Sequence, residues 1–205
     1  MSSENIKNVV FDIGNVLVRW APLEIVRLTF GDSTSIEDKA KSIFQSDIWL
    51  NLNKGLLSEN GAKAQYHEVL GLTELECDRL FYYVKQTQIL IYGSVELLRR
   101  CKSAGYNVFA LTDNVHEIVS HLKASYTFWD LFEGAIVSAE VGLLKPQPEI
   151  YESLLSQYGL KASETVFIDD MPYNVEGAES VGIKAIQFES AVQCEKALKS
   201  LGVQC

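Results

Sequence analysis

The sequence predicts a three-layer α/β fold, in which a doubly wound parallel sheet lies between two layers of helices. Two observations indicate it: short apolar segments rich in Val, Ile and Phe are bounded by Gly, Asp, Asn or Ser, and helical patterns separate the later ones. Continuous apolar runs are typical of strands buried on both faces. Strand–helix–strand alternation indicates parallel strands with right-handed crossovers. The predicted strands span residues 8–11, 107–111, 135–137, 165–168 and 183–186.

Two helices of the predicted sheet domain are marked by the residues at their ends. Apolar side chains recur at helical spacing from Val95 to Ala104, and Gly105 follows as the stop. The same spacing recurs between Pro148, early in the next helix, and Gly159, after its end. Both helices connect successive strands of the predicted sheet.

Residues 19–90 interrupt this alternation. They hold no convincing strand, and helix-like stretches occupy 23–30, 36–44, 59–70 and 74–86. A segment of about 70 residues is too long for a loop of a compact domain. We therefore expect a helical cap subdomain at 19–90, inserted into a core domain made of 1–18 and 91–205.

Composition excludes several classes of protein. The chain has 205 residues, of which 47% are hydrophobic, so it can bury a sizeable core without a stabilising metal or disulfide. Its 18 basic and 27 acidic residues give a net charge of −9, which argues against binding to nucleic acid. No apolar run approaches the roughly 20 residues of a membrane span, and Met1–Asn5 do not resemble the start of a secretory signal. Because the four cysteines form no Cys-x-x-Cys pair, we expect free thiols and a cytoplasmic protein.

Polar side chains follow three of the predicted strands at the point where each strand ends. Asp12 follows the first strand, Thr112 and Asp113 follow the second, and Asp169 and Asp170 follow the fourth. Ligands of an open parallel sheet bind at the carboxyl ends of its strands. We therefore expect these side chains to meet in one site.

The chemistry of this set favours a metal-assisted phosphoryl transfer. Adjacent carboxylates raise the pKa of one another unless a cation lies among them, and oxygen-only ligands suit Mg²⁺. The hydroxyl of Thr112, the backbone amides after Asp12 and the ammonium of Lys145, which follows the third strand, then complete a phosphate cradle. An Asp without a neighbouring His base can still act as a nucleophile, since carboxylates form covalent phosphoryl intermediates.

Four motifs in this order resemble those of the haloacid dehalogenase (HAD) superfamily of hydrolases. They are Asp12-x-Gly14-Asn15, Thr112, Gly142-x-x-Lys145-Pro146 and Asp169-Asp170-x-x-x-Asn174. The resemblance covers essentially the whole chain and implies a HAD-like, Rossmann-type core with an inserted helical cap. The Asp-Ile-Gly-Asn-Val form of the first motif is similar to a bacterial branch that includes phosphatases acting on glucose 1-phosphate, so a sugar phosphate is a candidate substrate.

The resemblance implies a role for each matching residue. Asp12 would be the nucleophile, with Thr112 and Lys145 as the other catalytic residues. The phosphate would be bound by Asp12, Ile13, Gly14, Thr112, Asp113 and Lys145. Mg²⁺ would be held by Asp12, the backbone carbonyl of Gly14, Asp169 and Asp170.

One position departs from the pattern of the superfamily. Most of its phosphatases carry a second Asp two residues after the nucleophile as general acid and base, and this chain has Gly14 there. Haloacid dehalogenases also lack that Asp, but they lack the acidic pair as well, so Asp169-Asp170 favours a phosphatase. We expect Mg²⁺-dependent hydrolysis of a small phosphorylated metabolite through an aspartyl-phosphate. A phosphomutase or phosphotransferase, a dehalogenase and a catalytically impaired binding protein stay open as alternatives.

Less specific interpretations apply to several of these residues. Asp169-Asp170 can also serve as an N-cap of the following helix. Arg19 and Trp20, at the exit from the first motif, form either a solvated hinge or a contact to the substrate. The three histidines are assigned no catalytic role.

Overall fold

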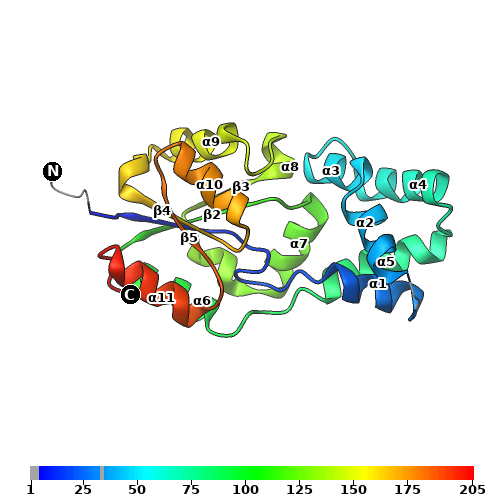
Figure 1. Ribbon diagram of the computed structural model, residues 1–205, viewed down its shortest axis with the longest axis horizontal. Helices are drawn as coiled ribbons and strands as arrows, with labels where there is room; N and C mark the ends of the chain where they lie inside the picture. Colours follow the sequence, from blue (N-terminus) through cyan, green and yellow to red (C-terminus); the bar gives the residue numbers. More distant parts are fainter. Residues whose placement is uncertain (1–4, 33–34) are drawn as a thin grey trace.

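A parallel five-stranded sheet forms the centre of the computed structural model, which describes residues 5–32 and 35–205 (Figure 1). The order of the strands is β3-β2-β1-β4-β5, and every pair is parallel. The strands are β1 Asn8–Phe11, β2 Asn107–Thr112, β3 Gly134–Val137, β4 Thr165–Asp169 and β5 Lys184–Gln187. Each predicted strand is present with its ends shifted by at most one residue, so the doubly wound α/β fold is confirmed.

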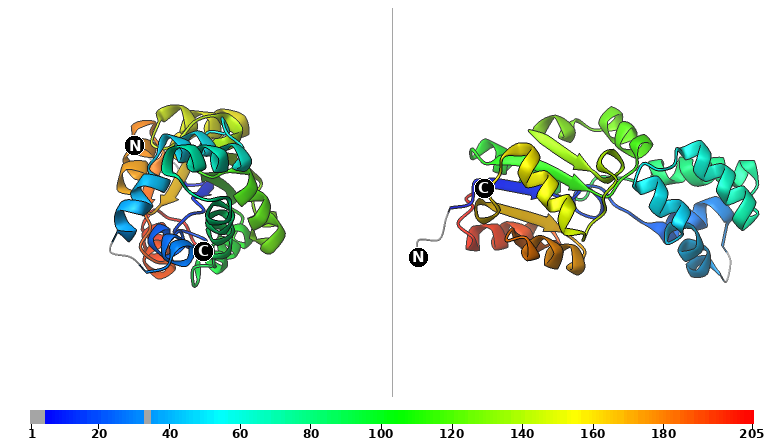
Figure 2. Two further views of the ribbon diagram at one scale, coloured as in Figure 1. Left: turned by 90° about the vertical axis from the view of Figure 1, so that its right-hand side faces the viewer. Right: turned by 90° about the horizontal axis from the view of Figure 1, so that it is seen from above.

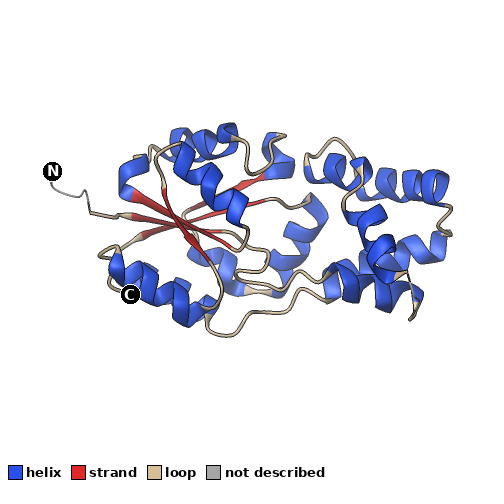
Figure 3. Ribbon diagram, in the orientation of Figure 1, coloured by secondary structure: helices blue, strands red, loops and turns tan. Residues whose placement is uncertain are grey.

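Helices cover both faces of the sheet. Successive residues of each strand point to opposite sides, and since the strands carry apolar residues on both sides, both faces need to be covered. Val10, Phe109 and Phe167 pack with α9 and α10 on one face, whereas Val9 and Val166 contact the face covered by α6, α7 and α11. The helical elements around the sheet are α6 Ser94–Ser103, α7 His116–Ser125, η1 Thr127–Leu131, α8 Ser138–Val141, α9 Pro148–Tyr158, η2 Ala162–Glu164, α10 Pro172–Ser180 and α11 Ala191–Ser200. Figure 3 shows the three layers, with the strands in red between the helices.

Five further helices, which we call the insert helices, gather at one end of the molecule (Figure 2). They are α1 Pro22–Phe30, α2 Ile36–Phe44, α3 Asp47–Asn53, α4 Glu59–Leu70 and α5 Glu74–Gln86. Four of them coincide with predicted helices to within one residue, while α3 was not predicted. The insert helices lie beyond the carboxyl ends of the strands, where the candidate site is expected.

Two extended segments connect the insert helices to the sheet domain. Val18 and Leu90 form an isolated antiparallel bridge. On either side of it, the amide of Arg19 donates to the carbonyl of Ile89 at 2.9 Å, and the amide of Ile91 donates to that of Leu17 at 2.9 Å. The chain therefore leaves and re-enters the sheet domain at the same place.

The structure also bears on the expectations from composition. Among the described residues no helix is long and apolar enough to cross a membrane. All four cysteines are free, and Cys77, Cys101 and Cys194 are buried. The inference of no secretory signal rests on Met1–Asn5, of which residues 1–4 lie outside the described residues.

Candidate active site

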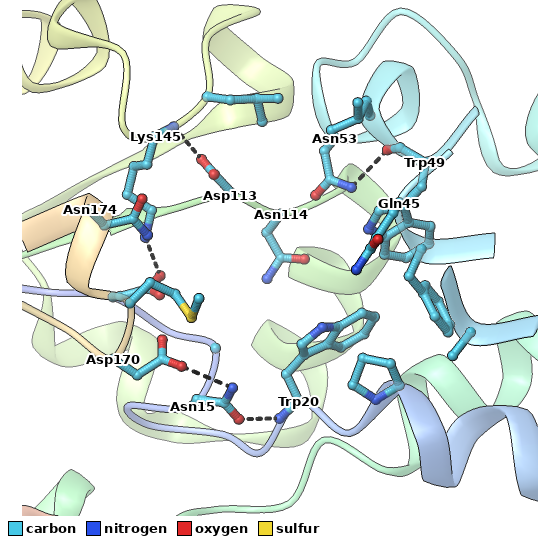
Figure 4. A pocket seen from close by; sticks show the side chains of 18 of the residues that line it. Asn15, Trp20, Gln45, Trp49, Asn53, Asp113, Asn114, Lys145, Asp170 and Asn174 are labelled. Carbon is cyan, nitrogen blue, oxygen red and sulfur yellow. Dashed lines mark hydrogen bonds and ion pairs between the residues drawn. The ribbon is translucent and has the colours of Figure 1, made fainter. Parts of the chain in front are cut away.

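A cavity of about 770 Å³ lies between the carboxyl ends of the strands and the insert helices. Asp12, Asp113 and Asp170 line it from the ends of three strands, together with Lys145 from the loop after α8. Figure 4 shows Lys145, Asp113 and Asp170 on one side of this space, and Trp20, Gln45 and Trp49 on the opposite side. The topology thus brings together residues that are up to 158 positions apart in the sequence, from Asp12 to Asp170.

Asp12 is buried at the end of β1, in the centre of the sheet. Its Oδ1 accepts a hydrogen bond from the backbone amide of Ile13 at 2.7 Å and lies 3.0 Å from Nζ of Lys145. Among the described residues, all the hydrogen bonds that reach this carboxylate end on Oδ1. One oxygen of Asp12 is therefore fixed and the other is left for a ligand.

Lys145 links Asp12 to Asp169. Its buried ammonium lies 2.6 Å from Oδ2 of Asp169 and 3.4 Å from the carbonyl oxygen of Leu111. Asp169 in turn accepts hydrogen bonds from the backbone amide of Met171 at 2.8 Å and from Nδ2 of Asn174 at 3.0 and 3.1 Å. Both oxygens of Asp169 are therefore engaged by protein groups. The side-chain amide of Asn174 reaches back to Asp169, which gives a structural reason for the spacing between these two residues in the fourth motif.

Asp170 differs from its neighbour in sequence because it lines the cavity, and its Oδ2 accepts a hydrogen bond from Nδ2 of Asn15 at 3.1 Å. Ligand atoms of Asp12, Asp169 and Asp170 all lie within 4.8 Å of one another. An oxygen-only set of this kind fits a hard divalent cation such as Mg²⁺. Since Asp169 is already saturated, Asp12 and Asp170 are the carboxylates best placed to reach a cation in the cavity.

Asn15 is the last residue of the first motif, and the sequence alone indicated no role for it. Its side chain bridges two parts of the site: Nδ2 donates to Asp170, and Oδ1 accepts from the backbone amide of Trp20 at 2.9 Å. Its φ of +53° lies in the left-handed region, which Asn tolerates better than most residues do. The motif Asp-x-Gly-Asn therefore carries, at its last position, both a turn and a support for Asp170.

The remaining predicted phosphate ligands differ in whether they are buried beside the cavity or line it. Thr112 is buried at the end of β2, and Ile13 is fully buried with its amide already bound to Asp12. Gly14 lines the cavity. Asp113 also lines it, and its Oδ1 accepts the backbone amide of Lys145 at 3.1 Å. Asp113 thus holds the loop that carries Lys145.

The two residues at the exit from the first motif separate in the structure. Trp20 lines the cavity, in contact with Phe44 and Trp49 of the insert helices. Arg19 instead pairs with Glu24 at 2.8 Å. Of the two, Trp20 lies where a substrate could reach it, and its contact with the substrate stays a prediction.

Ser138, which sequence reasoning missed, joins the insert helices to the sheet domain beside the cavity. Its buried hydroxyl donates to the backbone carbonyl of Asn53 at 2.7 Å and accepts the backbone amide of Asn114 at 2.9 Å. Close by, the backbone of Gly55 approaches Ala139 so tightly that an added Cβ would lie 2.1 Å from its carbonyl oxygen. A serine followed by a small residue carries no motif, so only the folded structure reveals this contact.

Burial and crowding determine the electrostatics of the site. Burial raises the pKa of Asp12 to about 8, and the charge of Asp169 adds to this effect while Lys145 opposes it. Burial also raises the pKa values of Asp113 and Asp170. Burial alone would lower the pKa of Lys145, but Asp12 and Asp169 outweigh it and hold that pKa above its ordinary value. Four carboxylates thus share one ammonium, which leaves the site short of positive charge.

The chain is similar in sequence to proteins that are named as phosphatases. The chain is 28% identical over 195 residues to the sesquiterpene phosphatase astK of Aspergillus oryzae, across 95% of this chain and 96% of that protein. It is 26% identical over 208 residues to a D-ribitol-5-phosphate phosphatase of Bacteroides thetaiotaomicron, across 94% of this chain and 97% of that protein.

The fold is also similar to that of a solved structure. A HAD family enzyme from Bacteroides thetaiotaomicron, crystallised with magnesium and inorganic phosphate, superposes with a TM-score of 0.76 at 23% identity, across 91% of this chain and 96% of that one. The family model of the haloacid dehalogenase-like hydrolases matches residues 6–182. The chain is therefore a hydrolase that belongs to this family.

Proposed function

We propose that this protein is a Mg²⁺-dependent phosphatase that hydrolyses a small phosphate monoester through an aspartyl-phosphate on Asp12. The observation that carries the proposal is the position of Asp12, which lies at the end of the central strand, lines the cavity and is held by Lys145 at 3.0 Å. The relatives named as phosphatases support the same reaction class. We further propose that residues 19–90 act as a cap over a core made of 1–18 and 91–205.

The reaction would proceed in two steps. Oδ2 of Asp12 attacks phosphorus, the ester P–O bond breaks, and the leaving group departs as an alkoxide, which takes a proton from water. Water then attacks the aspartyl-phosphate, which releases inorganic phosphate and regenerates the carboxylate. Lys145, which stays protonated, neutralises charge on the transferring group and opposes the rise in the pKa of Asp12 that burial causes.

Asp12, Asp170 and the backbone carbonyl of Gly14 would hold Mg²⁺ at the edge of the cavity. The bound ion supplies positive charge to the phosphate oxygens and offsets the excess of carboxylates. Asp169 lies within ligand distance of the cluster, but its bonds to Lys145, Met171 and Asn174 suit it to positioning Lys145. Asn15 would orient Asp170 from behind.

The substrates of the two relatives differ widely. One is named for a sesquiterpene phosphate and the other for a sugar-alcohol phosphate, so their names alone do not select a leaving group. A sugar phosphate, suggested by the first motif, stays a candidate. A phosphotransferase would share the first step and differ only in the acceptor that replaces water.

Hydrolysis of p-nitrophenyl phosphate tests the proposal. We expect turnover that requires Mg²⁺, is lost in a chelator and is absent in the isosteric variant Asp12→Asn. Turnover by Asp12→Asn equal to that of the natural chain would contradict the role of Asp12. No turnover by the natural chain with any phosphate ester would instead favour a binding protein, and release of halide from a 2-haloacid would favour a dehalogenase.

A further inference from the structure

The side of the cavity that faces the catalytic carboxylates is built from aromatic side chains. Trp20 is stacked on Trp49, with ring centroids 5.6 Å apart and an interplanar angle of 16°. Phe44 meets both rings edge-on, at 5.1 and 5.0 Å. All three line the cavity (Figure 4 labels the two tryptophans), and they come from three separate segments: the linker before α1, helix α2 and helix α3.

Two exposed leucines extend this wall. Leu23 on α1 and Leu50 on α3 are 45% and 41% exposed, and both line the cavity. A large apolar side chain that is left open inside a cavity beside an active site is a surface that a ligand can cover. We call Trp20, Leu23, Phe44, Trp49 and Leu50 the apolar wall.

Two polar side chains on the same side have their amide nitrogens engaged by backbone carbonyls. Nδ2 of Asn53 donates to the carbonyl of Trp49 at 2.8 Å, and Nε2 of Gln88 donates to the carbonyl of Val84 at 3.2 Å. Glu37, Lys41 and Gln45 also line the cavity, with side chains that are exposed to solvent. Against the apolar wall itself, a polyhydroxylated leaving group would bury hydroxyls against carbon, and each hydroxyl without a partner costs free energy.

The cavity also has room for more than the phosphate. Its volume of about 770 Å³ lies within the range of roughly 300–1,000 Å³ that encloses drug-sized ligands. Lys145 and Asp170 lie at the strand-end side of the cavity, whereas Trp20 and Trp49 of the apolar wall lie across from them (Figure 4). A substrate therefore has its phosphate fixed at one end and its organic group fixed at the other.

We infer that the apolar wall is a binding site for the leaving group, and that the substrate is the phosphate monoester of an apolar or aromatic alcohol rather than of a polyol. The inference rests on the proposed phosphatase function and names the substrate class of the same site. Apolar contacts with the wall contribute roughly in proportion to the area that they bury.

A series of primary alkyl phosphates tests this inference, because methyl, butyl and hexyl phosphate share the same leaving-group chemistry. With Mg²⁺ saturating, kcat/KM should rise about fourfold for each methylene that the cavity buries. Ribitol 5-phosphate and glucose 6-phosphate, which are also esters of primary alcohols, serve as polyol probes, and hexyl phosphate should exceed both. Equal kcat/KM along the alkyl series, or a preference for the polyols, would overturn the inference while leaving the phosphatase function standing.

Variants of the wall connect the selectivity to named residues. Trp20→Ala should reduce the ratio of kcat/KM for hexyl to methyl phosphate at least tenfold. Because Leu50 is exposed, Leu50→Gln keeps the fold and should reduce the same ratio. Tyr82→Ala removes an exposed aromatic of α5 that does not line the cavity, and it should leave the ratio unchanged. A ratio unaffected by both wall variants would contradict the inference, whereas the failure of every ester to react would count against the proposed function instead.

Discussion

The ammonium of Lys145 lies 3.0 Å from Oδ1 of Asp12, with both side chains buried beneath the cavity. A buried carboxylate is costly unless a cation compensates it, and Lys145 is itself shared with Asp169 at 2.6 Å. The partial compensation leaves Asp12 with a raised pKa. The carboxylates of the site are therefore not fully compensated by Lys145, and a divalent cation would supply the missing positive charge.

The first prediction concerns the stability of Asp12→Asn without metal. The pKa of Asp12 is about 8 in the folded chain and about 4 when unfolded, so the folded state binds more protons between these values. Its contribution to stability therefore falls as the pH rises from about 4 to about 8. The neutral Asn avoids this loss, so the variant should gain in Tm over the natural chain more at pH 8 than at pH 5.

Thermal melts in a chelator at the two pH values measure this effect. Asp32→Asn provides a matched control, since Asp32 is an exposed carboxylate that pairs with Arg27 and does not line the cavity. The difference in Tm between Asp32→Asn and the natural chain should not grow between pH 5 and pH 8. A gain for Asp12→Asn that is the same at both pH values would contradict the raised pKa of Asp12.

The second prediction separates the two adjacent acids. Asp169→Ala removes a partner of the buried Lys145, so it should destabilise the chain by about 3–5 kcal/mol. Asp170→Ala loses one hydrogen bond from Asn15 and relieves repulsion, so its change in stability should be under about 1 kcal/mol. Urea denaturation in a chelator distinguishes the two.

The response of Tm to Mg²⁺ should depend on Asp170, the acid whose loss costs little stability. Ligand linkage requires that Tm rises with Mg²⁺ concentration if the folded state binds the ion. Asp170→Ala should flatten this rise, because Asp170 faces the cavity with few protein partners. An equal Mg²⁺ response in the natural chain and Asp170→Ala would remove Asp170 from the metal site.

The third prediction concerns Asn15, whose amide supports Asp170. Loss of a group that orients a metal ligand typically costs 10–100-fold in metal affinity. Asn15→Gly and Asn15→Ala should both weaken Mg²⁺ binding by about this factor, as measured by calorimetric titration. Both variants lose the hydrogen bonds of the Asn15 side chain, and Asn15→Ala should be about 1–2 kcal/mol less stable than Asn15→Gly, because the φ of +53° strains alanine but not glycine. Equal Mg²⁺ affinity in all three chains would show that Asp170 needs no support.

The parts of this structure that the sequence predicted are those that depend on local patterns. The strands are buried on both faces, so each is an uninterrupted apolar run, and the acids follow directly at their carboxyl ends. Asp12, Asp113 and Asp170 could therefore be placed at one edge before the fold was known. Most of the insert helices were predicted for the same reason, since their apolar residues recur at helical spacing.

The unpredicted parts depend on contacts between distant segments. Helix α3 has seven residues and is held by a Ser46 cap and by packing of Trp49 on Phe44, which leaves little periodic signal. The bond from Asn15 to Asp170 joins residues 155 positions apart. Nothing in the sequence around Trp20 indicates that it will meet Phe44 and Trp49. The gathering of carboxylates at the strand ends was thus predictable, and the cluster of Trp20, Phe44 and Trp49 was not.

The last prediction follows from Gly14, which stands where a general acid would protonate the departing oxygen. Such an acid typically contributes about 10²–10⁴-fold. Without it the leaving group departs with negative charge, so kcat/KM should depend steeply on the pKa of the leaving alcohol. Aryl phosphates of similar size and graded leaving-group pKa measure this slope while keeping the contacts with the apolar wall nearly constant.

Gly14→Asp supplies the missing acid at little steric cost. A Cβ at this position would meet only the Cβ of Trp20, at an ordinary 4.0 Å, and Gly14 does not have the positive φ that favours glycine. The variant should fold, accelerate esters of poor leaving groups by up to about 10²-fold and flatten the slope. Gly14→Ala is the control, since it adds the Cβ without a proton donor and should keep the slope of the natural chain. If the natural chain has a flat slope while chemistry limits its rate, another group already donates the proton, and the consequence drawn from Gly14 is wrong.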